Sequence, residues 1–282
     1  MILKKDYFCP MNLRLLVIPF LSLVLFSSCS EYQKALRKND VKEMYDLANS
    51  YYEQGDYVKA KRLFEVIAPK YAGRPQGERL SFFFANAQYL TGSYYLSSYQ
   101  FERFIKSYPN SDKREEASFL EAASYFKMSP KFSLDQTDTD TALIKLQSFI
   151  NDYPDSEYFA SANEMVQTLN IKKQQKAFEI AKQYDKLGEF NLPVLFSAIT
   201  SLNNFILENP GSIYREEAYF IRLKSATILA ENSTFQKMDQ RFKDALKYYN
   251  EFKRNYPNSR FTEEADAYKE KIDESLLSLT SS

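Results

Sequence analysis

The sequence predicts an all-α protein, a solenoid of five helix pairs followed by a C-terminal capping helix. Two observations predict this fold class. The 22 Tyr and 23 Phe residues recur at helical spacing, which favours packing between helices. A twelve-residue phrase also repeats at intervals typical of stacked helical repeats. It stands at 101–112, 146–157, 202–213 and 249–260, with a degenerate copy at 63–74, and successive copies are 37, 45, 56 and 47 residues apart.

The phrase predicts the end of one helix, a sharp turn and the start of the next helix. Each full copy has an apolar residue eight positions before a proline, a Phe five before it and a Ser two after it. In the second copy, Leu146, Phe149 and Ile150 form a stripe on one helical face. Proline cannot continue a helix, and the Ser or Asp after it can cap the next one. Asp112 followed by Glu115 fits a capping box.

The N-terminal residues 1–28 read as a signal peptide rather than as part of the fold. A basic start precedes an apolar run at 15–26 that is too short to span a membrane, and Met11 is an alternative start to Met1. Small residues before Cys29 resemble a bacterial lipoprotein signal, in which the cysteine carries the lipid. A simple secretory signal with an accidental cysteine is the alternative. Cys9 lies inside the signal, so Cys29 is the single cysteine left after processing.

The repeats follow in order after a lipidated N-terminus and linker at 29–40. Residues 41–156 hold repeats one to three, and residues 157–282 hold a long linking helix, repeats four and five and the capping helix. A polar, Asp-rich insertion at 128–140 interrupts the third repeat and predicts a surface loop. Helices are expected at 41–53, 57–70, 112–127, 139–152, 157–187, 192–208, 213–230, 239–255 and 261–279, with a further pair in repeat two.

The first repeat resembles the tetratricopeptide repeat. Ala48 and Ala60 stand where small residues let two paired helices approach closely, and Tyr51 and Phe64 stand where larger residues fill the gaps. The turn Gly55-Asp56-Tyr57 separates the two helices. The resemblance implies a right-handed α-solenoid of five tetratricopeptide-like helix pairs plus a C-terminal capping helix.

The composition argues against an enzyme and against a cofactor, a metal site or nucleic-acid binding. The chain has no His, and after processing it has no cysteine beyond Cys29, so the commonest general base and Cys/His zinc sites are missing. The formal net charge is 0, which gives no electrostatic footprint for nucleic acid. The Asp-rich insertion lacks the Gly and closing Glu of an EF-hand. Three carboxylate pairs remain, in the first turns of predicted helices, where they favour the helix dipole: Glu115-Glu116, Glu216-Glu217 and Glu263-Glu264.

The combination of a lipid anchor, five repeats, a Tyr-Pro-Asn/Asp-Ser phrase and a terminal helix resembles the outer-membrane assembly lipoprotein BamD (ComL) family. This resemblance implies a lipid-anchored scaffold on the periplasmic face of the outer membrane. Its implied partners are the periplasmic domains of BamA, other subunits of the assembly machinery and unfolded outer-membrane proteins. The family leads us to expect an arginine at the partner contact nine residues before the fourth-repeat proline, and Ser201 stands there.

Two other functions compete with this one. One is a repeat-containing envelope scaffold for cell division or peptidoglycan synthesis. The other is a glycan-binding lipoprotein resembling SusD, although SusD-like chains are much longer and use sugar-stacking Trp, which this chain lacks.

A peptide-binding groove is the candidate site. Aligning repeats one and two superposes Tyr45 on Phe82, Asn49 on Asn86 and Tyr52 on Tyr89, at offsets that face the concave groove in tetratricopeptide arrays. The two amides can pair with the backbone of an extended peptide, and the rings can support its apolar side chains. Alternatively, the amides are merely solvated and the aromatic residues pack between repeats.

Overall fold

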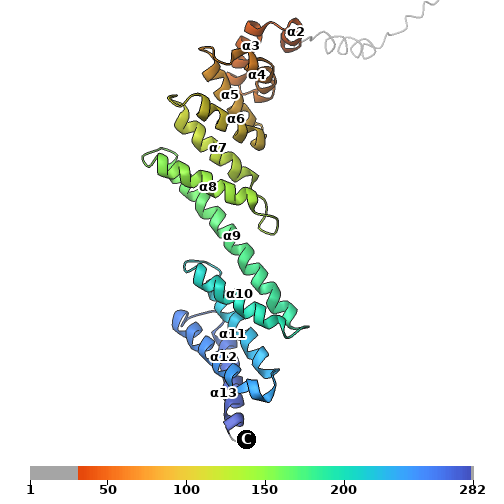
Figure 1. The fold of residues 1–282 in the computed structure, drawn as a ribbon, viewed down its shortest axis with the longest axis vertical. Helices are drawn as coiled ribbons and strands as arrows, with labels where there is room; N and C mark the ends of the chain where they lie inside the picture. The colour runs from red at the N-terminus through yellow and green to blue at the C-terminus, as the bar shows by residue number, and fades with distance from the viewer. Residues whose placement is uncertain (1–30, 281–282) are drawn as a thin grey trace, which may run out of the picture. The chain divides into compact units, whose positions relative to one another are not determined.

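The computed structural model describes residues 31–280, and these residues form helices joined by short loops (Figure 1). The signal peptide and Cys29 lie outside the described residues. Within 31–280 no helix combines the length and apolar character needed to cross a membrane. The helices are α2 (Glu31–Lys38), α3 (Val41–Glu53), α4 (Tyr57–Tyr71), α5 (Gly77–Leu90), α6 (Tyr94–Ser107), α7 (Arg114–Met128), α8 (Thr137–Asp152), α9 (Phe159–Gly188), α10 (Val194–Glu208), α11 (Arg215–Glu231), α12 (Phe235–Asn255) and α13 (Thr262–Thr280).

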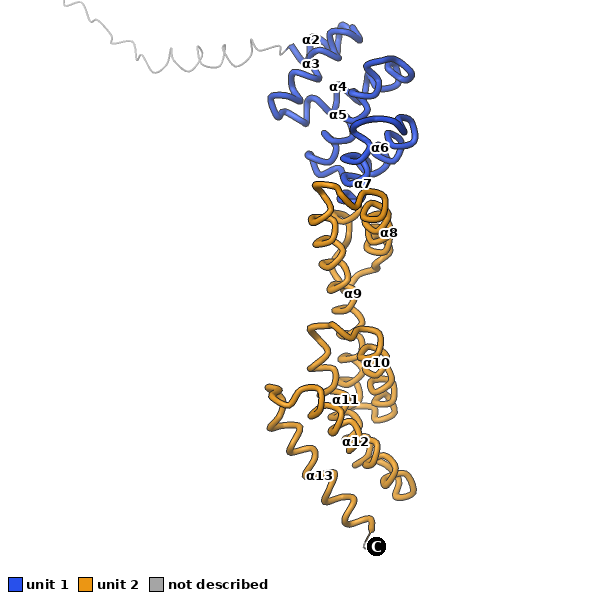
Figure 2. The backbone as a smooth tube through the Cα atoms, turned by 90° about the vertical axis from the view of Figure 1, so that its left-hand side faces the viewer, with its two compact units in different colours: residues 1–124 blue, residues 125–282 orange. Residues whose placement is uncertain are grey.

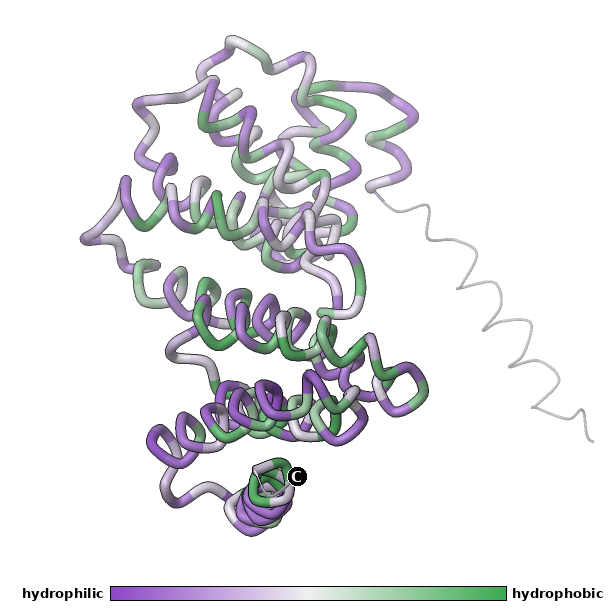
Figure 3. Tube along the Cα trace, turned by 60° about the horizontal axis from the view of Figure 1, so that its bottom comes forward, coloured by the Kyte–Doolittle hydropathy of each residue, from purple (hydrophilic) through white to green (hydrophobic). Residues whose placement is uncertain are grey.

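The predicted all-α repeat fold is confirmed. Neighbouring helices pack in pairs, α3 with α4, α5 with α6, α9 with α10 and α11 with α12, and α13 packs against α11 and α12 at the end of the last pair. The long helix expected at 157–187 is present as α9, a single helix of 30 residues. Along the helices, hydrophobic stretches alternate with hydrophilic ones, as Figure 3 shows, which is the pattern of helices that bury one face.

Two compact units make up the chain, and they are coloured separately in Figure 2. The first unit ends at Ser124 and the second begins at Tyr125, so the boundary falls inside α7. It therefore lies earlier than the division between repeats at 156/157 drawn from the sequence. The physical reason is that α8 packs against α9, which ties the second half of repeat three to the repeats that follow.

The recurring phrase folds into the same turn in all four copies. The residue before each proline donates its backbone N–H to the carbonyl of a buried Phe four positions earlier, at distances of 2.8 to 3.0 Å. This residue has φ between −126° and −138° and ψ of 64° to 67°, outside the α region that a following proline disfavours. The four turn residues are Tyr108, Tyr153, Asn209 and Tyr256, and the four phenylalanines are Phe104, Phe149, Phe205 and Phe252.

The serine of the phrase completes each turn. Its hydroxyl oxygen accepts the backbone N–H two residues later in Ser111, Ser156, Ser212 and Ser259. Ser259 also donates to Glu216 at the start of α11, over 2.6 Å, and Ser111 donates in the same way to Glu78 at the start of α5. In the first full copy Ser111 accepts the N–H of Lys113 just before α7, and the capping box of Asp112 with Glu115 stays a prediction.

Helix α2 was missed by the sequence analysis, which assigned 29–40 to a linker. Ala35 is its one buried residue, and Tyr32 meets the ring of Tyr51 edge-on at 6.2 Å. Asn39 ends the helix with φ of +53°, and Asp40 then caps α3 by accepting the N–H groups of Lys42 and Glu43. The helix was missed because eight residues with one inward position carry almost no periodic signal.

Candidate functional site

The first half of the candidate groove lies on α3, where Tyr45 and Asn49 lie on adjacent turns of the helix. The ring of Tyr45 stacks on Tyr71 of α4 with 4.9 Å between centroids. The Nδ2 of Asn49 donates to the carbonyl oxygen of Tyr45 over 2.8 Å. The Oδ1 of Asn49 is buried, and no donor among the described residues reaches it. A buried acceptor without a partner costs about 1–3 kcal/mol.

The second half of the groove joins repeat one to repeat two. Tyr52 of α3 stacks flat on Phe83 of α5, with centroids 4.2 Å apart and planes 7° from parallel. Its hydroxyl oxygen accepts a hydrogen bond from Nδ2 of Asn86 over 2.7 Å. Burial is the main cause that raises the pKa of Tyr52, so the hydroxyl is neutral at physiological pH and keeps its proton for donation.

Phe82 is a correction to the sequence-based groove. It is only 3% exposed, and it packs edge-on against Phe101 and Phe104 of α6 at 5.9 and 5.6 Å. Tyr45 occupies the equivalent position in repeat one and stays partly exposed, so the two aligned positions differ in environment. Phe82 therefore belongs to the core between repeats and is not a surface on which a peptide can rest.

Tyr89 remains on the surface side of its helix. Its ring meets Tyr94 of α6 edge-on at 5.6 Å, and burial raises its pKa. The structure thus brings Tyr52 directly to Asn86 and Asn49 to Tyr45, while Phe82 turns inward. Each amide nitrogen already donates a hydrogen bond within the protein, whereas the Oδ1 of Asn49 is buried and has no donor among the described residues.

Phe83 and Arg79 are groove residues that the sequence analysis missed. The guanidinium of Arg79 lies 4.9 Å from the Phe83 centroid, and the same side chain pairs with Glu53 of α3 at 3.2 Å. The guanidinium therefore makes a cation–π contact with Phe83, the ring on which Tyr52 stacks. The sequence alone does not single out Phe83, because residues 82–84 are three consecutive Phe residues that point in different directions. Packing decides which of them faces the groove.

The carboxylate pairs of the sequence analysis serve local structure where their contacts are seen. Glu216 accepts from Ser259, Glu217 pairs with Lys182 at 2.6 Å, and Glu116 pairs with Lys113 at 2.7 Å. Through residues 31–280, no group of three or more Cys, Asp or Glu side chains is arranged to hold a metal ion.

Comparison with known proteins gives a consistent result. The model of the YfiO family, described as outer membrane lipoprotein, matches residues 37–194 and 191–278. The chain is 30% identical over 177 residues to a protein of Aquifex aeolicus provisionally named outer membrane protein assembly factor BamD, and the match covers 62% of this chain and 58% of the relative. It is 24% identical over 181 residues to the outer membrane protein assembly factor BamD of Caulobacter vibrioides, covering 64% of this chain and 59% of that protein.

A longer match exists with the protein of the same name from Xylella fastidiosa. It is 24% identical over 233 residues and covers 77% of this chain and 76% of the relative. The chain spans less than two thirds of the length of the Aquifex and Caulobacter relatives.

Proposed function

This chain belongs to the YfiO family of outer membrane lipoproteins, and from that premise we propose that it acts in the assembly of outer-membrane proteins. It would do so as a lipid-anchored scaffold on the periplasmic face of the outer membrane. The observation that carries the proposal is the family match, which covers nearly all of the described residues. The relatives named as outer membrane protein assembly factors support it.

Lipid on Cys29 is the proposed anchor. Cys29 lies two residues before Glu31, where α2 begins. Two residues span at most about 7 Å, so lipid at this position would hold α2 and the first repeat close to the membrane surface.

The proposed partners are BamA and unfolded outer-membrane substrates. The side chain at the position of the family's partner arginine is Ser201, which lies half-buried on α10, so a BamA contact here would use other residues. For substrates, we propose the groove of α3 and α5. Asn49 and Asn86 would pair with the backbone of an extended strand, and Tyr45, Tyr52 and Tyr89 would flank its side chains.

Copurification tests the assembly role. An affinity-tagged chain is isolated from detergent extracts of cells that express it at natural levels, and its partners are identified. BamA and other assembly subunits are the expected partners. Division proteins or a sugar transporter in place of BamA would support the envelope-scaffold or the glycan-binding alternative and overturn the proposal.

Peptide titration tests the groove. The probe is a labelled ten-residue peptide that alternates aromatic and polar residues, as a barrel C-terminal strand does. We expect Asn49→Ala combined with Asn86→Ala to weaken binding about tenfold, because hydrogen-bond acceptors are lost. Asn86→Ala also removes the bond to Tyr52, so Tyr52→Phe is the matched control that removes this bond alone. Unchanged affinity in the double variant would place the substrate site elsewhere.

A further inference from the structure

No residue in the middle of α9 is buried. Its buried residues fall into two groups, Ala162 and Leu169 near the start and Phe178, Ala181, Asp185 and Gly188 near the end. Helix α8 packs against α9 and so does α10, yet no residue from 170 to 177 is buried. Figure 1 shows α9 running as a single helix between α8 and α10. All of these residues belong to the second unit.

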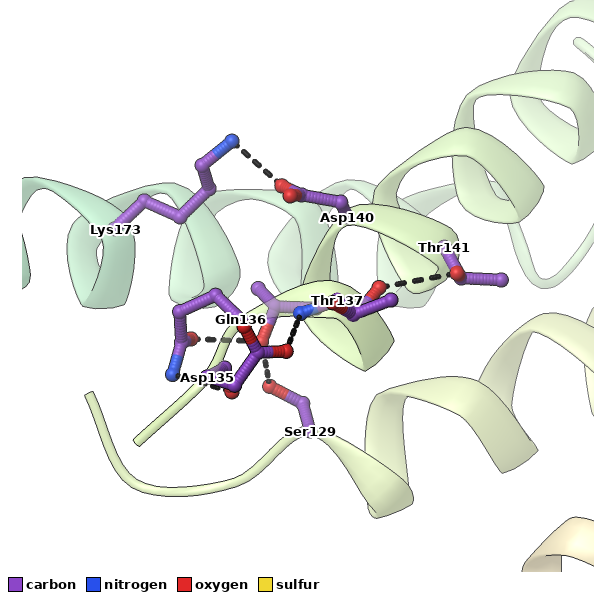
Figure 4. A network of polar contacts seen from close by, with 8 residues as sticks. Ser129, Asp135, Gln136, Thr137, Asp140, Thr141 and Lys173 are labelled. Atoms are coloured by element: carbon purple, nitrogen blue, oxygen red, sulfur yellow. Dashed lines mark hydrogen bonds and ion pairs between the residues drawn. The ribbon is translucent and has the colours of Figure 1, made fainter. Parts of the chain in front are cut away.

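The loop 129–136, called here the clasp loop, lies along this part of α9. Lys172 donates to the hydroxyl of Ser129 over 2.7 Å and to its carbonyl oxygen over 3.3 Å. Lys176 donates to the carbonyl oxygen of Leu134 over 2.6 Å. Just after the loop, Asp140 at the start of α8 pairs with Lys173 of α9 at 2.7 Å (Figure 4).

The clasp loop is also fixed internally. The side-chain amide nitrogen of Gln136, Nε2, donates to the carbonyl oxygens of Lys131 and Leu134 over 2.9 and 3.0 Å. Thr139 donates to Oε1 of Gln136 and contacts the hydroxyl of Ser129, which ties the two ends of the loop together. These hydrogen bonds fix the conformation of the clasp loop, which lies on the surface beside α9.

Two hollows flank Phe132 of this loop and together form a groove along α9. One has a volume of about 380 Å³ and includes Thr168 and Ile171, and the other has about 470 Å³ and includes Ile180 and Lys186. From Thr168 to Lys186 the helix rises by about 27 Å at 1.5 Å per residue. An extended chain advances about 3.3 Å per residue, so roughly eight residues would fill the groove.

The chemistry of this groove is cationic. Five lysines line it and one carboxylate, Glu179, does. Ile171 and Ile180 are 42% and 44% exposed, and because nine residues turn a helix through about 900° they lie on opposite edges of the groove. The lysines are Lys131, Lys172, Lys176, Lys182 and Lys186.

The positive charge is only partly neutralised by the protein itself. Lys182 pairs with Glu217, but the contacts of Lys172 and Lys176 are with hydroxyl and carbonyl oxygens. Burial lowers the pKa of Lys172, as expected for a cation that loses water without gaining a carboxylate. Carboxylates brought by a partner would complement this excess.

We propose that the α9 groove binds an extended, acidic segment of a partner protein. Its carboxylates face the lysines. Lys172, Lys176 and Lys186 lie within about 80° of one another around the helix, so one line of carboxylates can meet all three. Alternate side chains of an extended chain point to the same side, so the expected partner carries a carboxylate at every second residue. The inference is independent of the groove on α3 and α5 and of the proposed assembly role.

The test uses the full chain and a fluorescein-labelled peptide of sequence Glu-Leu-Glu-Ser-Glu-Leu-Glu-Ser, titrated by anisotropy. We expect binding that weakens with added salt, and binding at least about tenfold weaker when Gln replaces every Glu. Lys186→Glu should weaken binding about tenfold.

The control is Lys237→Glu, the same charge change at an exposed position of α12, and it should leave affinity within about twofold. Lys186 is exposed, so circular dichroism of Lys186→Glu should match the unchanged protein. Equal affinity for the Glu and Gln peptides, equal affinity in Lys186→Glu, or no binding at millimolar peptide would each overturn the proposal.

Discussion

Removing the carboxylate of Glu251 should lower the free energy of unfolding of the second unit, because this carboxylate pairs with a buried arginine. Arg222 of α11 has a side chain only 5% exposed, and its Nη2 donates to Oε2 of Glu251 on α12 over 2.6 Å. Its Nη1 donates to Oδ1 of Asn203 on α10 over 2.7 Å. The guanidinium lies 4.2 Å from the ring of Tyr248, so this one cation connects three helices.

The expected cost follows from the burial of the pair. Removing one partner of a buried ion pair costs about 3–5 kcal/mol, because the other charge stays buried and unpaired. Glu251 is 25% exposed, so water can reach part of the gap, and Asn203 still accepts from Arg222. We therefore expect Glu251→Ala to lower the free energy of unfolding by about 2–3 kcal/mol. For a unit of roughly 150 residues this lowers the melting temperature by about 4–12 °C.

Thermal unfolding followed by circular dichroism measures this cost, and hydrogen exchange assigns the transition to α11 and α12. Asp239→Ala is the control, because it breaks an exposed pair with Lys243 on the same helix and should cost at most about 1 kcal/mol. Replacing both partners, as Arg222→Met with Glu251→Leu, should restore part of the lost stability. If Glu251→Ala and Asp239→Ala shift the midpoint equally, the account of Arg222 as a buried, dependent charge is wrong.

Three further predictions concern packing, anchoring and pH. Ala60 is fully buried with Met44 and Ala48, so Ala60→Leu should overpack repeat one and cost about 1–3 kcal/mol, and an unchanged unfolding midpoint would contradict this. Cys29→Ala should leave unprocessed precursor or release the protein from the membrane fraction, and a processed variant that stays membrane-bound in high salt would refute lipidation. Burial and then the hydrogen bond to Asp266 raise the pKa of Tyr249 to about 12. Above pH 10 the unfolded chain releases this proton more readily than the folded one, so stability falls as pH rises from 10 through 12, and Tyr249→Phe should make that fall less steep in pH-dependent urea unfolding.

The helices could be read from the sequence because their signals are local. Pro109, Pro154, Pro210 and Pro257 each mark the end of a helix, and Asp40 caps α3 with its own side chain. The length of α9 follows from a stretch without Pro or Gly until Gly188. Such signals fix where elements begin and end, and from their order the repeat fold follows.

The candidate sites depend on contacts that no local pattern contains. Phe82 and Tyr45 share a position in aligned repeats, yet Phe82 is buried against two Phe residues of α6 while Tyr45 stays partly exposed. Asn86 reaches Tyr52 across 34 residues of sequence. The α9 groove requires the clasp loop to lie on a helix about 40 residues further along, and the sequence shows only a polar insertion there.

The constancy of the proline turn has a consequence for how such an array changes length. Spacings between copies range from 37 to 56 residues, but the four full copies keep one backbone geometry, so length differences are absorbed elsewhere, in the clasp loop and in α9. One residue added to a helix rotates everything beyond it by about 100°, which would turn the next apolar stripe away from its partner. An added residue within a loop between paired helices carries no such penalty. The turns are therefore the fixed joints of a modular chain, and the loops are where insertions and new functions can be accommodated.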